Sequence, residues 1–194
     1  QYDARRMVEE AHAMGVLAGG RGTAAHFGLT DQVDLTMGTF SKSFASLGGV
    51  IVGDAKVIDY IKHNARALIF SASMPPAQVA AVAAALQVMK DEPERVSRVM
   101  EIGEKMRQGY HALGYNTLNS QTPIVPILIG DEMKCLLFWK ALGEAGIYVN
   151  PVLPPACPPN QTLLRTSYMA THTDAQLTRV LETFAVVGKD LGII

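Results

Sequence analysis

The sequence predicts an α/β fold for its first part and a small α+β unit for its second. Two short apolar runs, at residues 33–37 and 50–52, indicate buried strands, and apolar positions at helical spacing follow them. From residue 124 to 191, strand and helix patterns alternate as in a compact α+β unit. The predicted domains are residues 1–105, as the remainder of a larger domain, and residues 106–194.

The chain opens on what resembles the end of a helix at residues 1–6, followed at once by a strand at residues 6–11. That strand ends in Glu9, Glu10 and His12, and a glycine-rich turn follows. Open α/β sheets bind ligands at the carboxyl ends of their strands, so these residues indicate a site. A surface loop with a solvated acid pair explains them equally well. Because a strand so near the N-terminus already ends in functional-looking residues, we expect the first part of the domain to be missing.

Residues 37–43 place Lys42 on a loop between two predicted strands, among the hydroxyl groups of Thr39, Ser41 and Ser43. Burial lowers the pKa of a lysine amine because it disfavours the charged form, and an uncharged amine can form a Schiff base. The surrounding hydroxyls could bind a phosphate group. A solvated loop lysine without a chemical role is the alternative.

A predicted strand at residues 68–70 precedes Ser71, Ser73 and two prolines, which mark the start of an alanine-rich helix at residues 77–89. The two hydroxyls therefore lie close to a helix N-terminus, where free N–H groups and the helix dipole favour an anion. Plain capping of the helix is the alternative.

The remaining predicted elements complete this framework. They are helices at 54–63, from the N-cap Asp91 to about Leu113, at 133–145, and from a capping box at 173–176 to about Leu191, with strands at 124–129, after residue 149 and at 163–167.

Arg165 interrupts the last of these strands, between Leu164 and Tyr168. An unpaired charge is costly to bury, so an arginine in such a strand has a partner. A guanidinium binds a carboxylate through two parallel hydrogen bonds, which indicates a substrate carboxylate. An internal salt bridge is the alternative.

The composition excludes several classes of partner. The net charge of −1 and the 18% of charged residues give no electrostatic reason to expect nucleic acid or an anionic membrane. No apolar run approaches the roughly 20 residues of a membrane-spanning helix. Cys135 and Cys157 lie far apart and form no metal-binding pattern, so no metal is expected, and a reducing, cytoplasmic environment is the default.

Four motifs, in order and spacing, resemble the α-oxoamine synthases. The motifs begin at Val8 (VEEAHAMGVL), Gly38 (GTFSKS, with two glycines shortly after), Phe70 (FSASMPP) and Leu164 (LRTSYMATHT). Members of this family are pyridoxal-phosphate enzymes of the aspartate-aminotransferase fold type, fold type I. The resemblance extends over the whole chain but over only about the C-terminal half of a member. The TFSKS sequence and the proline-rich loop from Asn150 are most similar to the serine palmitoyltransferase branch of the family.

The resemblance implies a role for each candidate residue. Lys42 would hold the cofactor covalently and later carry the α-proton, and Thr39 would contact the cofactor phosphate. His12 would bind the phenolic oxygen of the cofactor ring. Arg165 would bind the carboxylate of the amino-acid substrate.

Two further implications concern the partner subunit and a departure from the family. Ser71 and Ala72 would reach the phosphate of the neighbouring subunit's cofactor, which implies a homodimer with shared active sites. Three residues before His12 the family has aspartate, which pairs with the pyridinium nitrogen, and here Glu9 stands instead. Its side chain is one methylene longer, and the electron-accepting strength of the ring depends on this pairing. Glu10 is a poor substitute because strand alternation turns it away.

The implied reaction condenses L-serine with a long-chain acyl-CoA, palmitoyl-CoA, and releases CO2 and CoA to give 3-oxosphinganine for sphingolipid biosynthesis. A family member that uses glycine or alanine with a different acyl-CoA is one alternative. A non-catalytic fragment or partner subunit is another. The isolated chain is expected to bind cofactor poorly, because the ring-stacking histidine and the first phosphate-binding loop of the family would lie in the missing half.

Overall fold

The computed structural model describes residues 4–194, which form two compact units. The first unit extends to Ser97 and the second covers Arg98–Ile194, so the division falls within helix α5 (Glu94–Ala112). The predicted boundary after residue 105 stays a prediction. Of the predicted helix end at residues 1–6, the first three residues lie outside the described part, and residues 4–6 are not helical.

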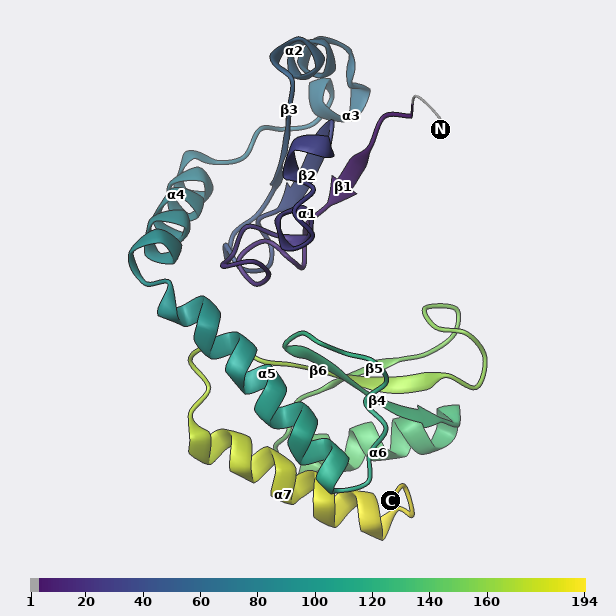
Figure 1. Cartoon of the computed structure of the whole chain (residues 1–194). Helices are drawn as coiled ribbons and strands as arrows, with labels where there is room; N and C mark the ends of the chain where they lie inside the picture. The colour runs from purple at the N-terminus through teal and green to yellow at the C-terminus, as the bar shows by residue number, and fades with distance from the viewer. Residues whose placement is uncertain (1–3) are drawn as a thin grey trace. The chain divides into compact units, whose positions relative to one another are not determined.

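The first unit is built on a three-stranded sheet with the order β1-β2-β3 (Figure 1). Its strands are β1 (Met7–Glu9), β2 (Leu35–Thr39) and β3 (Gly49–Gly53), with β1 and β2 parallel and β2 and β3 antiparallel. The short helix α1 (Thr23–His26) and the 3-10 helix η1 (Thr30–Gln32) lie between β1 and β2, and α2 (Ala55–Asn64), α3 (Arg66–Ile69) and α4 (Pro76–Asp91) follow β3. The α/β class is therefore confirmed, as are the helix after β3 and the helix that begins at the prolines.

Two local predictions were wrong. Residues 68–70 do not form a strand, because the N–H groups of Leu68 and Ile69 both donate to the carbonyl oxygen of Ala65 at 3.0 Å, within a helical turn. Three consecutive apolar residues carry no periodicity that separates helix from strand. Asp91 does not cap α5 but ends α4, and α5 begins three residues later, after Pro93.

The first unit leaves much of its apolar surface uncovered. Both strands that flank the Lys42 loop were predicted to be buried, yet four of the five residues of β3 are exposed. The side chains of Val52 and Phe70 are 57% and 78% exposed. Large apolar side chains of α2, α3 and α4 are exposed as well: Val57, Tyr60, Leu68, Ile69, Val79, Leu86 and Val88.

The second unit has a closed core. Its sheet has the antiparallel order β4-β6-β5, with β4 (Ile124–Gly130), β5 (Asn150–Val152) and β6 (Thr162–Ser167). Figure 1 shows α5, α6 (Glu132–Glu144) and α7 (Asp174–Asp190) against one face of this sheet. Strand alternation explains the core, because the inward residues of the strands and the apolar stripes of the helices form one buried cluster. Its fully buried members include Ile102, Met106, Tyr110, Val125, Ile127, Phe138, Leu142, Leu164 and Phe184.

The capping box that was predicted to open the last helix is confirmed. The Thr173 hydroxyl accepts a hydrogen bond from the N–H of Gln176 at 3.3 Å, and the Gln176 side chain accepts one from the N–H of Thr173 at 2.9 Å. None of the helices between residues 4 and 194 is both long and apolar enough to cross a membrane.

A glycine contact within the second unit gives a stability test. Tyr115 donates its hydroxyl proton to the carbonyl oxygen of Phe184 at 2.7 Å, and a methyl group at Gly188 would overlap that hydroxyl. We expect Gly188→Ala to lower the free energy of unfolding by about 1–3 kcal/mol, the usual cost of overpacking. Adding Tyr115→Phe should recover part of the loss, because it removes the overlapping oxygen. Denaturant unfolding measures both changes.

Gly143 in α6 provides the control, since no atom lies within 4 Å of a methyl group added there. Gly143→Ala should be neutral or stabilising by up to about 1 kcal/mol, the difference in helix propensity. Equal stability of the Gly188→Ala protein and the parent would contradict the packing described here.

Candidate active site

Parallel pairing brings the first two predicted site segments to one edge of the sheet. Glu9 on β1 is the register partner of Met37 on β2, and the N–H of Glu10 donates to the carbonyl oxygen of Met37 at 2.8 Å. Because the strands are parallel, the turn that carries His12 and the loop that carries Lys42 both leave the sheet at its carboxyl edge. The predicted grouping of these segments agrees with this topology.

A direct hydrogen bond joins the two segments beyond the strands. The hydroxyl of Ser43 donates to the carbonyl oxygen of Met14 at 2.8 Å. Gly15 permits this approach, because a Cβ there would lie 2.5 Å from the Cβ of Ser43 and its φ of +83° disfavours other residues. Lys42 precedes Ser43 directly, and His12 lies two residues before Met14.

The backbone around Lys42 is fixed on its other side as well. The Ser46 hydroxyl lies 2.8 Å from the side-chain oxygen and 3.0 Å from the carbonyl oxygen of Gln78 on α4. Phe44 is buried and packs edge-on against Phe40, with ring centroids 5.5 Å apart. Lys42 itself is exposed, so the described residues of this chain do not bury its amine as was expected.

Thr39 and Ser41 form a hydroxyl pair beside Lys42. Their side-chain oxygens lie 3.0 Å apart, and the Thr39 hydroxyl also donates to the carbonyl oxygen of Gly48 at 3.2 Å. Both groups are neutral and can donate or accept, as a phosphate-binding site requires.

The adjacent acids Glu9 and Glu10 have different surroundings. Glu10 is buried, and its two carboxylate oxygens accept the N–H groups of Thr23 at 2.6 Å and Ala24 at 2.8 Å, at the start of α1. Glu9 is exposed on the opposite side of the strand, where one of its oxygens accepts the N–H of Ala11. Glu10 is therefore a structural residue, which agrees with the prediction that strand alternation turns it away from the site.

Ser71 and Ala72 lie in the extended segment between α3 and α4, and both are exposed. The Ser71 hydroxyl donates to the carbonyl oxygen of Ala67, and α4 has no side-chain cap. The alternative that serine caps this helix is thus wrong. The described contacts do not bring Ser71 or Ala72 to the edge that carries Lys42, and their predicted contact with a second subunit's cofactor stays a prediction.

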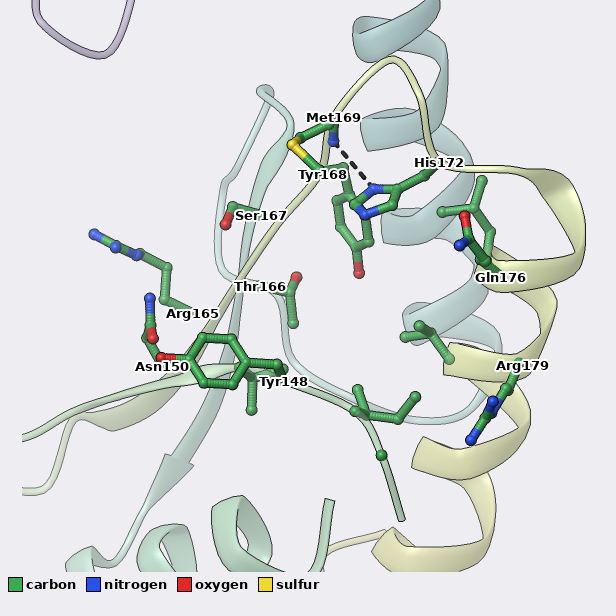
Figure 2. Close-up of a pocket in the computed structure, with 15 residues that line it drawn as sticks. Tyr148, Asn150, Arg165, Thr166, Ser167, Tyr168, Met169, His172, Gln176 and Arg179 are labelled. Atoms are coloured by element: carbon green, nitrogen blue, oxygen red, sulfur yellow. Dashed lines mark hydrogen bonds between the residues drawn. The ribbon is translucent and has the colours of Figure 1, made fainter. Parts of the chain in front are cut away.

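Arg165 lies at a pocket within the second unit (Figure 2). The cavity is about 480 Å³ and is lined by residues 146–150, residues 165–169 and side chains of α7 and the loop before it. None of the described residues that line it is acidic, and Arg165 forms no ion pair with any of residues 4–194. The buried Nε of Arg165 has no hydrogen-bond partner in that part of the chain. The internal salt bridge proposed as an alternative is therefore wrong for the described residues.

Several of the other polar groups that line this pocket are hydrogen-bonded within the protein. Tyr168 is hydrogen-bonded to the buried Tyr110 through their hydroxyls at 2.8 Å, and burial raises the pKa of both phenols, so they remain protonated. The Nδ1 of His172 accepts the N–H of Met169 at 3.1 Å. Arg179 donates to the carbonyl oxygen of Ala145 at 3.3 Å.

Sequence reasoning missed Asn150 and Tyr148 as residues that line the pocket. Both precede Arg165 by about fifteen residues, and only the pairing of β5 with β6 brings them beside it. The sequence predicted the two strands that carry Asn150 and Arg165, but it did not predict the register in which they pair.

The fold and the lysine loop at the carboxyl edge of the sheet indicate an enzyme, and comparison with known proteins identifies its family. Residues 1–184 match the family Aminotransferase class I and II, and the chain belongs to this family.

The chain is similar to a serine palmitoyltransferase of Bacteriovorax stolpii, with 50% identity over 190 residues that cover 97% of this chain and 45% of the relative. It is 45% identical to a putative 8-amino-7-oxononanoate synthase 2 of Mycobacterium tuberculosis, covering 98% of this chain and 25% of that protein. A solved structure of SPT with a PLP internal aldimine superposes with a TM-score of 0.94 at 34% identity, covering 99% of this chain and 49% of that one.

The predicted fold type and family are thereby confirmed, including the resemblance over about half of a member. The chain spans about half the length of the serine palmitoyltransferases that it matches.

The two neighbouring acids give a matched pair of variants. Glu10→Gln should lower the free energy of unfolding by about 1–3 kcal/mol, because the amide would turn an NH2 group toward one of two N–H donors. Glu9→Gln should change it by less than about 0.5 kcal/mol, because its one hydrogen bond needs only the retained oxygen. Urea unfolding of both variants measures the difference. A Glu9→Gln protein less stable than the Glu10→Gln protein would reverse these assignments.

Proposed function

We propose that this chain is the part of a pyridoxal-phosphate-dependent acyltransferase that carries the cofactor lysine and the substrate-binding arginine. The whole protein condenses L-serine with a long-chain acyl-CoA, palmitoyl-CoA, and releases CO2 and CoA to give 3-oxosphinganine. The observation that carries the proposal is the unpaired, buried Nε of Arg165 at a pocket without described acidic residues. The similarity to serine palmitoyltransferases supports this choice of substrates.

The residues at the carboxyl edge fit the cofactor. A phosphate requires neutral or cationic donors, and the Thr39–Ser41 hydroxyl pair directly precedes Lys42 in the chain, where the lysine amine forms no ion pair with any described acid. Pyridoxal phosphate supplies an electron-accepting ring that stabilises the carbanion at the amino-acid Cα.

In this proposal the residues of the first unit hold the cofactor and move one proton. Lys42 would hold the cofactor covalently through its amine and would later take up the proton from the substrate Cα. Thr39 binds the phosphate, and His12 donates to the phenolic oxygen. Glu9 would pair with the pyridinium nitrogen, and the Ala11 N–H occupies only one of its two carboxylate oxygens.

Arg165 binds the carboxylate of L-serine and so orients the bond from Cα to hydrogen for cleavage. Its two parallel N–H donors match a carboxylate in geometry, and the absence of an acid among the described lining residues leaves its charge available. Orientation of this kind lowers the barrier because the reacting groups meet already aligned.

Ser71 and Ala72 complete the phosphate site of a second subunit, so the active enzyme is a homodimer with shared sites. Their exposure in this chain supports an intermolecular role. The same assembly would supply the desolvation that the Lys42 amine lacks here.

The second candidate is an α-oxoamine synthase that uses glycine or alanine with a different acyl-CoA. The similarity to 8-amino-7-oxononanoate synthases, at 45% and 40% identity, favours it. A non-catalytic fragment or partner subunit is the third candidate.

Borohydride reduction tests the covalent role of Lys42. Reduction of the cofactor-loaded protein should fix a pyridoxyl group on Lys42, which peptide mapping by mass spectrometry locates. Lys42→Ala should abolish the label, whereas Lys56→Ala, an exposed lysine on α2, should retain it. A label on another lysine, or none on a loaded protein, would refute the assignment.

Competition between amino acids separates the candidate substrates. With palmitoyl-CoA present, L-serine should give a kcat/KM at least about tenfold above glycine and L-alanine, equivalent to about 1.4 kcal/mol of transition-state stabilisation. CoA release measures the rates. A preference for glycine or L-alanine would favour the second candidate, and no CoA release with any amino acid from a correctly labelled protein would favour the third.

A further inference from the structure

Three residues lie side by side across the sheet of the second unit at the level of Arg165. Arg165 on the central strand β6 is the register partner of Pro126 on β4 and of Asn150 on β5. Residues directly opposite one another in antiparallel strands have their side chains on the same face. Because Leu164 faces the buried core, these three residues lie on the face away from it.

The two neighbours of Arg165 differ in what they offer. Pro126 has neither an N–H group nor a polar side chain, so it contributes only an apolar wall. Asn150 is half-buried, lines the pocket, and carries an amide whose oxygen accepts and whose nitrogen donates. Figure 2 shows Asn150 and Arg165 on the same side of the strands, away from Tyr168, His172 and Gln176. Asn150 is thus the polar residue opposite Arg165 across the strands.

We propose that Asn150 is a positioning residue that orients the Arg165 guanidinium toward the carboxylate of the amino-acid substrate. This inference rests on the proposed function and adds a second residue to the carboxylate site. An amide suits the role because it can hold a guanidinium by a hydrogen bond without neutralising it. An aspartate of the same shape would form an ion pair with Arg165 and compete with the substrate.

The isosteric variant Asn150→Asp is therefore the decisive change. In the purified holoenzyme it should raise the dissociation constant for L-serine by about tenfold or more, the value of one charge-assisted hydrogen bond. The affinity for L-serinamide, which lacks the carboxylate, should remain within about twofold. Titration followed by the cofactor absorbance measures both constants. In steady-state kinetics the KM for L-serine should rise more than kcat falls.

Asn119→Asp provides the charge-matched control, because Asn119 is exposed in the same unit and does not line the pocket. It should leave both dissociation constants unchanged. Asn150→Ala should weaken L-serine binding less than Asn150→Asp, because it removes the orienting amide without adding a competing charge. Equal weakening of L-serine and L-serinamide by Asn150→Asp would show a general structural effect and overturn the inference.

Arg165→Gln separates this inference from the proposed function. If Arg165→Gln weakens L-serine binding and Asn150→Asp does not, Asn150 has no positioning role and the carboxylate site stands. If Arg165→Gln leaves L-serine binding unchanged, the carboxylate site itself fails. The 15N NMR signal of the Arg165 Nε–H group gives a readout that needs no cofactor. It should shift in Asn150→Asp because the new carboxylate accepts from the guanidinium, and an unshifted signal would contradict the pairing.

Discussion

The parallel pairing of β1 with β2 is the constraint on which the candidate cofactor site depends. It sends the turn after Glu9 and the loop after Thr39 out of the same sheet edge, and the Ser43 to Met14 hydrogen bond then joins them. The antiparallel return through β3 closes the lysine loop, with the N–H of Phe40 donating to the carbonyl oxygen of Gly48 at 2.9 Å. These hydrogen bonds thus fix the position of the Lys42 backbone. The side chain of lysine is long and flexible, so the amine nitrogen can move while the backbone stays in place.

In the proposed function the second unit meets a different physical requirement, since it must hold a cation ready for an anion. A guanidinium with an unsatisfied, buried Nε is costly, and neutralising it with an acid of the protein would be the stabilising choice. The described residues that line the pocket with Arg165 instead include no acid. If Arg165 binds a carboxylate as proposed, that arrangement lowers the stability of the unit in favour of affinity, a compromise expected where binding is the purpose. The closed core beneath the sheet, with Leu164 and Phe138 fully buried, tolerates this cost.

Features of the fold that depend on local sequence could be predicted, whereas those that depend on long-range strand pairing could not. The capping box at Thr173 and the prolines before α4 predicted their helix starts correctly, because capping and φ restriction act within a few residues. The run at residues 68–70 carries no such signal and was mistaken for a strand. The choice between a salt bridge and a free guanidinium at Arg165 depended on β4 and β5, whose residues lie far from it in sequence. For the same reason Asn150 was missed, and the exposure of Lys42 could not be read from the motif around it.

The contrast between the two units bears on how the enzyme would be assembled. The second unit buries its apolar residues in one cluster, whereas β3, α3 and α4 of the first present large apolar side chains to solvent. Apolar surface on that scale is stabilised when another surface covers it, at roughly 25 cal/mol for each Å² removed from water. The Lys42 amine is exposed in the same unit, and its chemistry benefits from the same removal of water. The proposed homodimer, together with the half of the family fold that this chain does not span, would meet both requirements at once. In the proposed assembly the folding stability of the first unit and the reactivity of its lysine would be coupled, because both would depend on the surfaces that cover the unit.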